Sequence, residues 1–230
     1  MPRSRPSLRA ALPLGALVVA LAALARPALA QPSEVALPNP RHVFEDSWYW
    51  GAKGGAMRFG TVVDGRVTAP LAGAEWLITH RRGALLVSAE QSFFDQASLV
   101  ADPYTSDGTR EISIHDARRY SFAALAAPVQ LGAVRPYAGL GLAMHVIRRA
   151  TPTGDFSTQA QLTYVSDAVS SGQSFVAPFL MAGAQAQFGL AAVFVQGSLS
   201  AAQSRTLFNR GGGSQIEAGI RLNVAPAFER

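Results

Sequence analysis

The sequence contains no cysteine and few charged residues. Without cysteine there is no disulfide framework, no thiolate metal site and no cysteine nucleophile. Charged residues make up 15% of the chain and hydrophobic residues 49%, which excludes intrinsic disorder but supplies few charges for a surface in water. A chain of 230 residues is long enough to bury a core without metals or cross-links. The composition therefore favours a folded protein whose surface is in contact with something besides water.

Acidic residues are missing from the first thirty positions. Four of the 20 basic residues lie there: Arg3, Arg5, Arg9 and Arg26. The rest of the chain has 16 basic against 15 acidic residues, so the formal charge of +5 falls to +1 without that segment. Nucleic-acid binding needs a basic face, and we expect no nucleic-acid partner.

Long hydrophobic runs are also missing, apart from a short one near the N-terminus. Residues 14–25 are apolar, residues 1–13 are basic, and Ala28 and Ala30 supply a small-x-small cleavage site. Twelve apolar residues make about 18 Å of helix, whereas a hydrocarbon core is about 30 Å thick, so a membrane anchor is the weaker alternative. The predicted divisions are a cleaved signal peptide at 1–30, an irregular N-terminal lead at 31–46 and one domain at 47–230.

The domain is organised by alternation of apolar and polar residues with a period of two, which indicates β-strands. Segments of about ten residues are separated by breaks that alternate between short and long. Antiparallel strands joined in this way form an up-and-down sheet, and eight of them can close into a barrel. The predicted strands are 48–59, 71–79, 84–93, 117–127, 135–147, 174–188, 191–200 and 214–224. The predicted long loops are 60–70, 94–116, 148–173 and 201–213.

One face of each predicted strand is apolar, and the other face carries the polar residues. On the last strand Ile220 and Leu222 share one face, and Glu217 and Arg221 share the other. A soluble barrel places its apolar face inside, whereas a membrane barrel places it outside. Export, low charge and strand length favour an eight-stranded transmembrane β-barrel in the outer membrane, with a soluble periplasmic ligand-binding barrel as the alternative.

Aromatic residues add weight to the membrane interpretation, because membrane barrels carry aromatic girdles at both interfaces. Those expected near the short turns are Trp48, Trp50, Trp76 and Phe188, and those near the long loops are Phe93, Tyr120 and Phe122. The first strand fits least well, because Arg58 shares the face of Gly54 and Ala56.

The chain resembles the small outer-membrane β-barrel proteins of Gram-negative bacteria, the OmpA-like and OmpX-like group. Its last strand is similar to the C-terminal assembly signal of that family, through Glu217, Gly219, Leu222 and Val224. The family usually ends on an aromatic residue, whereas this chain continues through 225–230. The resemblance implies recognition by the barrel-assembly machinery, contact with outer-membrane lipid and lipopolysaccharide, short turns in the periplasm and long loops outside the cell.

The interior of an eight-stranded barrel is just wide enough for side chains to fill it. The charged residues predicted to point inward balance, with three positive and three negative groups besides one histidine, as buried charges must be paired. A structural polar core is the main interpretation, and a gated ion path is the alternative. The predicted interior polar network is Lys53, Glu75, Glu90, Arg119, His145, Glu217 and Arg221.

Catalysis needs a nucleophile beside a base, and Ser113, His115 and Asp116 supply such groups where the fourth strand begins. This pattern is a weak catalytic signal, because a polar loop contains such residues by composition. Asp102, Asp107 and Glu111 lack the alternating spacing of a calcium loop, so we predict neither metal nor cofactor. The predicted function is a non-enzymatic scaffold that presents extracellular loops for binding or adhesion. The alternative is a lipid A-modifying barrel enzyme of the acyltransferase or deacylase type.

Overall fold

A computed structural model of the protein describes residues 46–63, 65–201, 207 and 212–224. The predicted signal peptide, all of the lead except Asp46, and the tail at 225–230 lie outside the described residues. The same holds for most of the predicted loop at 201–213.

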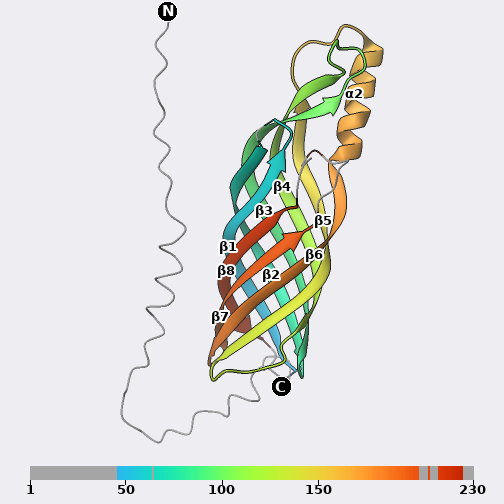
Figure 1. Ribbon diagram of the computed structural model, residues 1–230. Coiled ribbons are helices and arrows are strands. Elements are labelled where there is room, and N and C mark those ends of the chain that lie inside the picture. Colours follow the sequence, from blue (N-terminus) through green and yellow to red (C-terminus); the bar gives the residue numbers. More distant parts are fainter. Residues whose placement is uncertain (1–45, 64, 202–206, 208–211, 225–230) are drawn as a thin grey trace, which may run out of the picture. The chain divides into compact units, whose positions relative to one another are not determined.

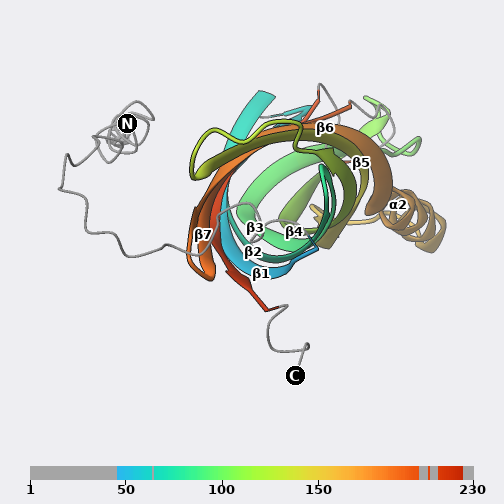
Figure 2. The ribbon, with the colours of Figure 1, turned by 90° about the horizontal axis from the view of Figure 1, so that it is seen from below.

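Eight antiparallel strands form a closed barrel (Figure 1). Each strand pairs with the next, and β1 pairs with β8, which closes the ring seen in Figure 2. This confirms the predicted all-β, up-and-down barrel. The strands are β1 Trp48–Thr61, β2 Gly65–His80, β3 Gly83–Ala101, β4 Thr109–Ala126, β5 Val134–Pro152, β6 Ser174–Phe188, β7 Ala191–Ser200 and β8 Ser214–Asn223.

The barrel is apolar on its outer surface and polar within. Leu140 on β5 is 64% exposed and Ile220 on β8 is 55% exposed, whereas Arg221 is fully buried. Trp50, Phe122 and other aromatic side chains also face outward. This distribution is the reverse of a soluble barrel and matches a surface in contact with lipid.

Four strands are much longer than predicted, all at the end away from the short turns. β2, β3, β4 and β5 contain 16, 19, 18 and 19 residues, whereas β7 and β8 contain 10 each. A tilted strand needs about 9–11 residues to cross a bilayer, so the longer strands extend well beyond it. The predictions of long loops at 60–70 and 94–116 were therefore wrong over most of their length, whereas at 148–173 the strand takes only residues 148–152 and a long connection between β5 and β6 remains.

A β-bulge explains where the predicted strands stopped. The register between β3 and β4 shifts between Ser92 and Asp95, and Asp116 has a positive φ of 50°. Beyond the bulge, Ile112 and Ile114 are buried while Ser113 and His115 lie on the outer face. The polarity of the two faces reverses here, as is expected where a strand passes from lipid into water. The period-two pattern is lost at the reversal.

Pro70 also obscured the start of β2. The register of β2 with β3 begins at Leu71, so residues before it pair with β1 alone. Proline is tolerated on such an edge because its missing N–H has no strand to bond.

The helix α2 (Gln159–Gly172) lies between β5 and β6 and was not predicted. The side chain of Thr158 caps it by accepting a hydrogen bond from the Gln161 N–H at 3.2 Å. Val165 and Val169 pack into an apolar cluster at this end of the barrel, and Figure 2 shows the helix outside the ring. We call residues 94–116 and 148–173 together the cap. No helix in the described part of the chain is long and apolar enough to cross a membrane.

The barrel interior is divided into layers. Along β1, Lys53 lies between Tyr49 and Met57, and along β2, Glu75 lies between Leu71 and Leu77. Tyr49 and Leu77 belong to an apolar cluster toward the short turns, and Met57 and Leu71 belong to the cluster toward the cap. An ionic layer is thus held between two apolar plugs.

Candidate functional site

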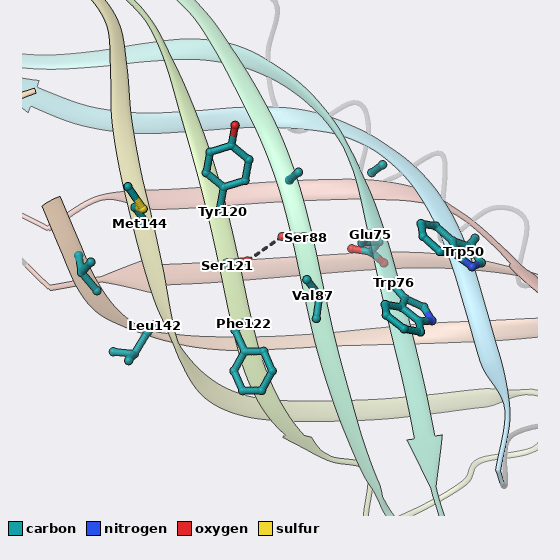
Figure 3. A pocket seen from close by; sticks show the side chains of 13 residues that line it. Trp50, Glu75, Trp76, Val87, Ser88, Tyr120, Ser121, Phe122, Leu142 and Met144 are labelled. Atoms are coloured by element: carbon teal, nitrogen blue, oxygen red, sulfur yellow. Dashed lines mark hydrogen bonds between the residues drawn. The ribbon is translucent and has the colours of Figure 1, made fainter. Parts of the chain in front are cut away.

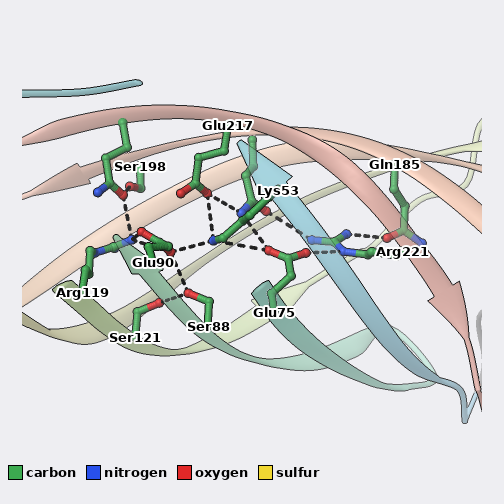
Figure 4. Close-up of polar contacts among 12 residues, drawn as sticks. Lys53, Glu75, Ser88, Glu90, Arg119, Ser121, Gln185, Ser198, Glu217 and Arg221 are labelled. Carbon is green, nitrogen blue, oxygen red and sulfur yellow. Dashed lines mark hydrogen bonds and ion pairs between the residues drawn. The ribbon is translucent and has the colours of Figure 1, made fainter. Parts of the chain in front are cut away.

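The ionic layer is centred on Lys53 (Figure 4). Its Nζ lies 2.6 Å from Glu90 Oε1, 3.1 Å from Glu217 Oε2 and 3.5 Å from Glu75 Oε2. All four side chains are at least nine-tenths buried. One ammonium therefore holds three carboxylates from three other strands.

Two arginines complete the charge balance of the layer. Arg221 Nε donates to Glu75 Oε1 at 2.5 Å, and its guanidinium stacks over the Phe194 ring at 3.9 Å. Arg119 Nη1 donates to Glu90 Oε2 at 3.1 Å and to Gln215 Oε1 at 2.7 Å. Charge-assisted bonds of this kind replace the water that burial removed.

The structure brings six of the seven predicted network residues into this layer. His145 lies opposite Arg119 in the register of β4 and β5 and stacks on Phe175, with ring centroids 4.7 Å apart. Its buried Nε2 has no hydrogen-bond partner among the residues that the structure describes. His145 is therefore inside the barrel, but it is not bonded into the network.

Gln196 is one network member that sequence reasoning missed. Its amide nitrogen donates to Glu75 at 3.2 Å and to Glu217 at 2.7 Å, and its oxygen accepts from Tyr137 at 2.9 Å and from Arg221 at 3.2 Å. The alternation of β7 places it inward beside Phe194, and that signal could have found it.

The structure places the catalytic candidates on the outer face of the cap. Ser113 Oγ lies 3.0 Å from His115 Nε2, and the carboxylate near His115 is that of Asp95, whose Oδ1 lies 3.2 Å from Nδ1. Asp116 does not join them, because its carboxylate accepts from the Phe94 N–H at 3.3 Å and faces Arg148 at 3.9 Å.

This cluster lacks the alignment of a catalytic triad. In a triad the serine and the carboxylate lie in line with the two ring nitrogens, on opposite sides of the imidazole. Here Asp95 Oδ1 is 3.2 Å from Ser113 Oγ as well as 3.2 Å from His115 Nδ1. The two ring nitrogens of His115 point away from each other, so oxygens in line with them would lie far apart. Ser113 Oγ and Asp95 Oδ1 are in contact and therefore cannot both be in line. Proton transfer from Ser113 to a carboxylate-oriented His115 is not built into this arrangement.

Asp102 organises the cap. Its fully buried carboxylate accepts from Arg110 Nε at 2.7 Å and from Gln161 Nε2 at 2.9 Å, which joins β4 to α2. Arg110 also donates to the backbone oxygen of Thr153 at 2.8 Å. Burial acts to raise the pKa of Asp102, but the hydrogen bonds from Arg110 and Gln161 outweigh it and hold the pKa below its usual value.

The four residues of the predicted assembly signal have structural roles within the barrel. Glu217 belongs to the ionic layer, Leu222 faces outward, and the Val224 N–H donates to the Trp48 oxygen at 2.7 Å. A Cβ on Gly219 would lie 2.2 Å from the Ala52 oxygen, so only glycine fits there. Recognition by the assembly machinery stays a prediction.

The closed barrel, its apolar outer belt and its ionic interior define an eight-stranded, up-and-down transmembrane β-barrel. No protein-family model and no curated protein matches the sequence.

Among solved structures, the chain is similar to neisserial surface protein A, with a TM-score of 0.51 and 11% identity over 76% of this chain and 96% of that one. This likeness concerns the fold. Other matches are Ail of Yersinia pestis in complex with the heparin analogue sucrose octasulfate (TM-score 0.47, 12% identity, 78% of this chain and 99% of that one) and OprG of Pseudomonas aeruginosa (0.42, 8%, 79% and 95%).

Proposed function

We propose that the protein is a non-enzymatic outer-membrane β-barrel that presents the cap outside the cell as a binding or adhesion surface. The outward apolar belt and the fold likeness support the membrane location. The orientation rests on the family resemblance, which implies short turns in the periplasm; the extended ends and α2 lie at the opposite end of the barrel. Export through the predicted signal peptide belongs to the same proposal.

The ordered cap is the observation that carries this proposal. Long strands continue past the membrane belt, and buried Asp102 ties them to α2 through Arg110 and Gln161. A barrel that only needed to cross the membrane would require neither feature. Binding residues are commonly displayed on segments that a rigid scaffold positions, and here the cap itself is held rigidly.

The filled interior argues against a general pore. The two apolar plugs flank the ionic layer, whose charges are paired with one another. A water-filled channel needs a wider barrel or a polar path along its whole length. The barrel therefore acts as the support for the cap.

Adherence of whole cells tests the proposal. A strain without the protein is complemented with the natural chain, with Asp102→Ala, or with Asp167→Ala, which removes an exposed carboxylate from α2. Attachment to immobilised matrix proteins and to cultured epithelial cells is then counted. We expect the natural chain and Asp167→Ala to restore attachment and Asp102→Ala to restore much less. Equal attachment with and without the protein would contradict the adhesion role.

A lipid A-modifying enzyme is the second candidate, favoured only by the contact between Ser113 and His115. The absence of triad alignment weighs against it. Mass spectrometry of lipid A from cells with the natural chain, with Ser113→Ala and with no protein decides the question. A mass change that needs Ser113 would establish the enzyme.

A further inference from the structure

A groove of about 500 Å³ runs over the outer face of β2, β3 and β4 (Figure 3). Ala74 and Ala89 pair across β2 and β3 and form its floor, because their short side chains leave the sheet low at this point. Larger side chains rise on either side. We call this feature the lipid-facing groove, and its outward-facing wall residues are Trp50, Trp76, Val87, Tyr120, Phe122, Leu142, Met144 and Val176.

One wall of the groove is rigid. Trp50 and Trp76 stack with ring centroids 5.5 Å apart and planes 7° from parallel, and Trp48 meets Trp76 edge-on at 5.7 Å. Across the floor, Tyr120 and Phe122 form the opposite wall in Figure 3. A trough with aromatic walls and an alanine floor fits a flexible hydrocarbon chain, which makes dispersion contacts on three sides.

The groove leads toward basic residues at the cap end of the apolar belt. The next outward row above Ala74, Ala89 and Tyr120 is Ala72, Gln91 and Arg118, as the strand registers show. Two residues along a strand correspond to about 7 Å. Within the residues that the structure describes, the exposed Arg118 side chain has no hydrogen bond or ion pair. Arg148 lies beyond Val146, the partner of Arg118 on β5. Among the described residues its one ion-pair contact is with Asp116, at 3.9 Å.

We propose that the lipid-facing groove binds an acyl chain of a phosphorylated lipid, and that Arg118 and Arg148 bind its phosphate. The site rests on the proposed membrane orientation, which puts these arginines in the headgroup region of the outer leaflet. The phosphorylated lipid of that leaflet is lipopolysaccharide, so the proposed ligand is its lipid A part. Lipid A carries two phosphates and several acyl chains. The trough ends beside Arg118, which has no ion pair among the described residues, and beside Arg148, which makes one long contact with Asp116. It is complementary to such a molecule in shape and in charge.

Native mass spectrometry of the full chain, purified in a non-ionic detergent, tests this site. The probes are bisphosphorylated hexa-acyl lipid A, the same lipid after removal of its phosphates, and phosphatidylethanolamine. We expect one bisphosphorylated lipid A per chain, with much weaker retention of the other two. Arg118→Ala should lower the affinity about five-fold, the effect of one arginine near an anionic lipid. Arg66→Ala, an exposed arginine near the β1–β2 turn, is the matched charge control and should leave the affinity unchanged.

A second pair of variants tests the groove itself. Ala89→Trp fills the floor, and Ala218→Trp places the same side chain on the outward face of β8, away from the groove. We expect Ala89→Trp to lose lipid A and Ala218→Trp to keep it. Ala74→Leu, a smaller intrusion, should weaken retention if Ala89→Trp does not fold. Heat-modifiable migration shows which variants are folded.

Three results would overturn the site. These are equal retention of phosphorylated and dephosphorylated lipid A, equal behaviour of Ala89→Trp and Ala218→Trp, and preference for phosphatidylethanolamine. A two-chain complex that Ala89→Trp abolishes would assign the groove to a second copy of the chain and would also refute the proposal. Fractionation separates this failure from that of the proposed function. A folded outer-membrane protein without lipid A refutes the site alone, whereas a soluble protein refutes both.

Discussion

A fully buried guanidinium is stable only when protein groups replace the water it has lost. Arg221 meets this condition through Glu75 at 2.5 Å and Gln185 at 2.6 Å. Removing it leaves Glu75 with Lys53 at 3.5 Å as its remaining charged partner. We therefore expect Arg221→Ala to lower the free energy of unfolding by about 3–5 kcal/mol. Urea unfolding in lipid vesicles measures this, with exposed Arg66→Ala as the control. Equal urea midpoints for the two variants would show that the ionic layer does not stabilise the barrel.

The pairing of these residues could be predicted from the sequence, but the amide contacts could not. Strand alternation predicts which side chains point inward, and barrel closure makes β1 and β8 neighbours, so Lys53 and Glu217 could be expected on adjacent strands of one interior. The height at which Gln196 meets Arg221 depends on the stagger of the strands around the barrel. Alternation carries no information about that stagger.

At the scale of the strand, the outer face must tolerate lipid. Leu140 is 64% exposed on the outer face of β5. An arginine at this position would place its charge in hydrocarbon, which costs about 2–4 kcal/mol near the bilayer midplane. We expect Leu140→Arg to impair folding into vesicles by that amount. Val63→Arg in the β1–β2 turn, where the side chain is also exposed, should have almost no effect. The fraction folded, read from heat-modifiable migration, compares them, and similar losses would mean that lipid does not contact β5.

The elements of the cap were harder to predict than those of the barrel. The predicted strand ends at 93, 117 and 147 coincide with the bulge, where Asp116 and Arg148 lie opposite each other. At the bulge the apolar–polar alternation shifts by one residue and its inner and outer faces exchange polarity. In the sequence, this break in the pattern looks the same as a loop. The helix α2 buries only a few side chains on one face, such as Val165 and Val169, so its pattern was too weak to separate from a polar segment.

The cap should respond to acid through Asp102. A carboxyl with a lower pKa in the folded protein stabilises the fold above its unfolded pKa, and this contribution is lost as the pH falls through the folded pKa. The unfolded value is about 3.9. We expect hydrogen-exchange protection factors in α2 to be constant from neutral pH to near that value and to fall below it. Asp102→Asn should show lower protection at neutral pH and little further change in acid. Unchanged protection in α2 of this variant would contradict the role of Asp102.

At the scale of the whole molecule, the closed barrel should unfold as a single unit and should resist unfolding by detergent until it is heated. Every strand is paired on both sides, and closed barrels leave no edge to fray. We expect unboiled protein to migrate differently from boiled protein on a detergent gel, and its circular dichroism to be β-rich. Recovery of the mature chain as a soluble periplasmic species would instead support the ligand-binding barrel.

The layered interior leads to a prediction about conductance. An ion crossing the barrel would have to pass the apolar cluster around Leu77, the ionic layer and the apolar cluster around Met57 in series. If the ionic layer opened, the two apolar clusters would still block the path. An apolar constriction needs no charged group to exclude ions. Arg221→Ala should therefore destabilise the barrel without raising its conductance in planar bilayers above that of the natural chain. A raised conductance in Arg221→Ala would identify the ionic layer as a gate, because loss of one charge pair would then be enough to open a path.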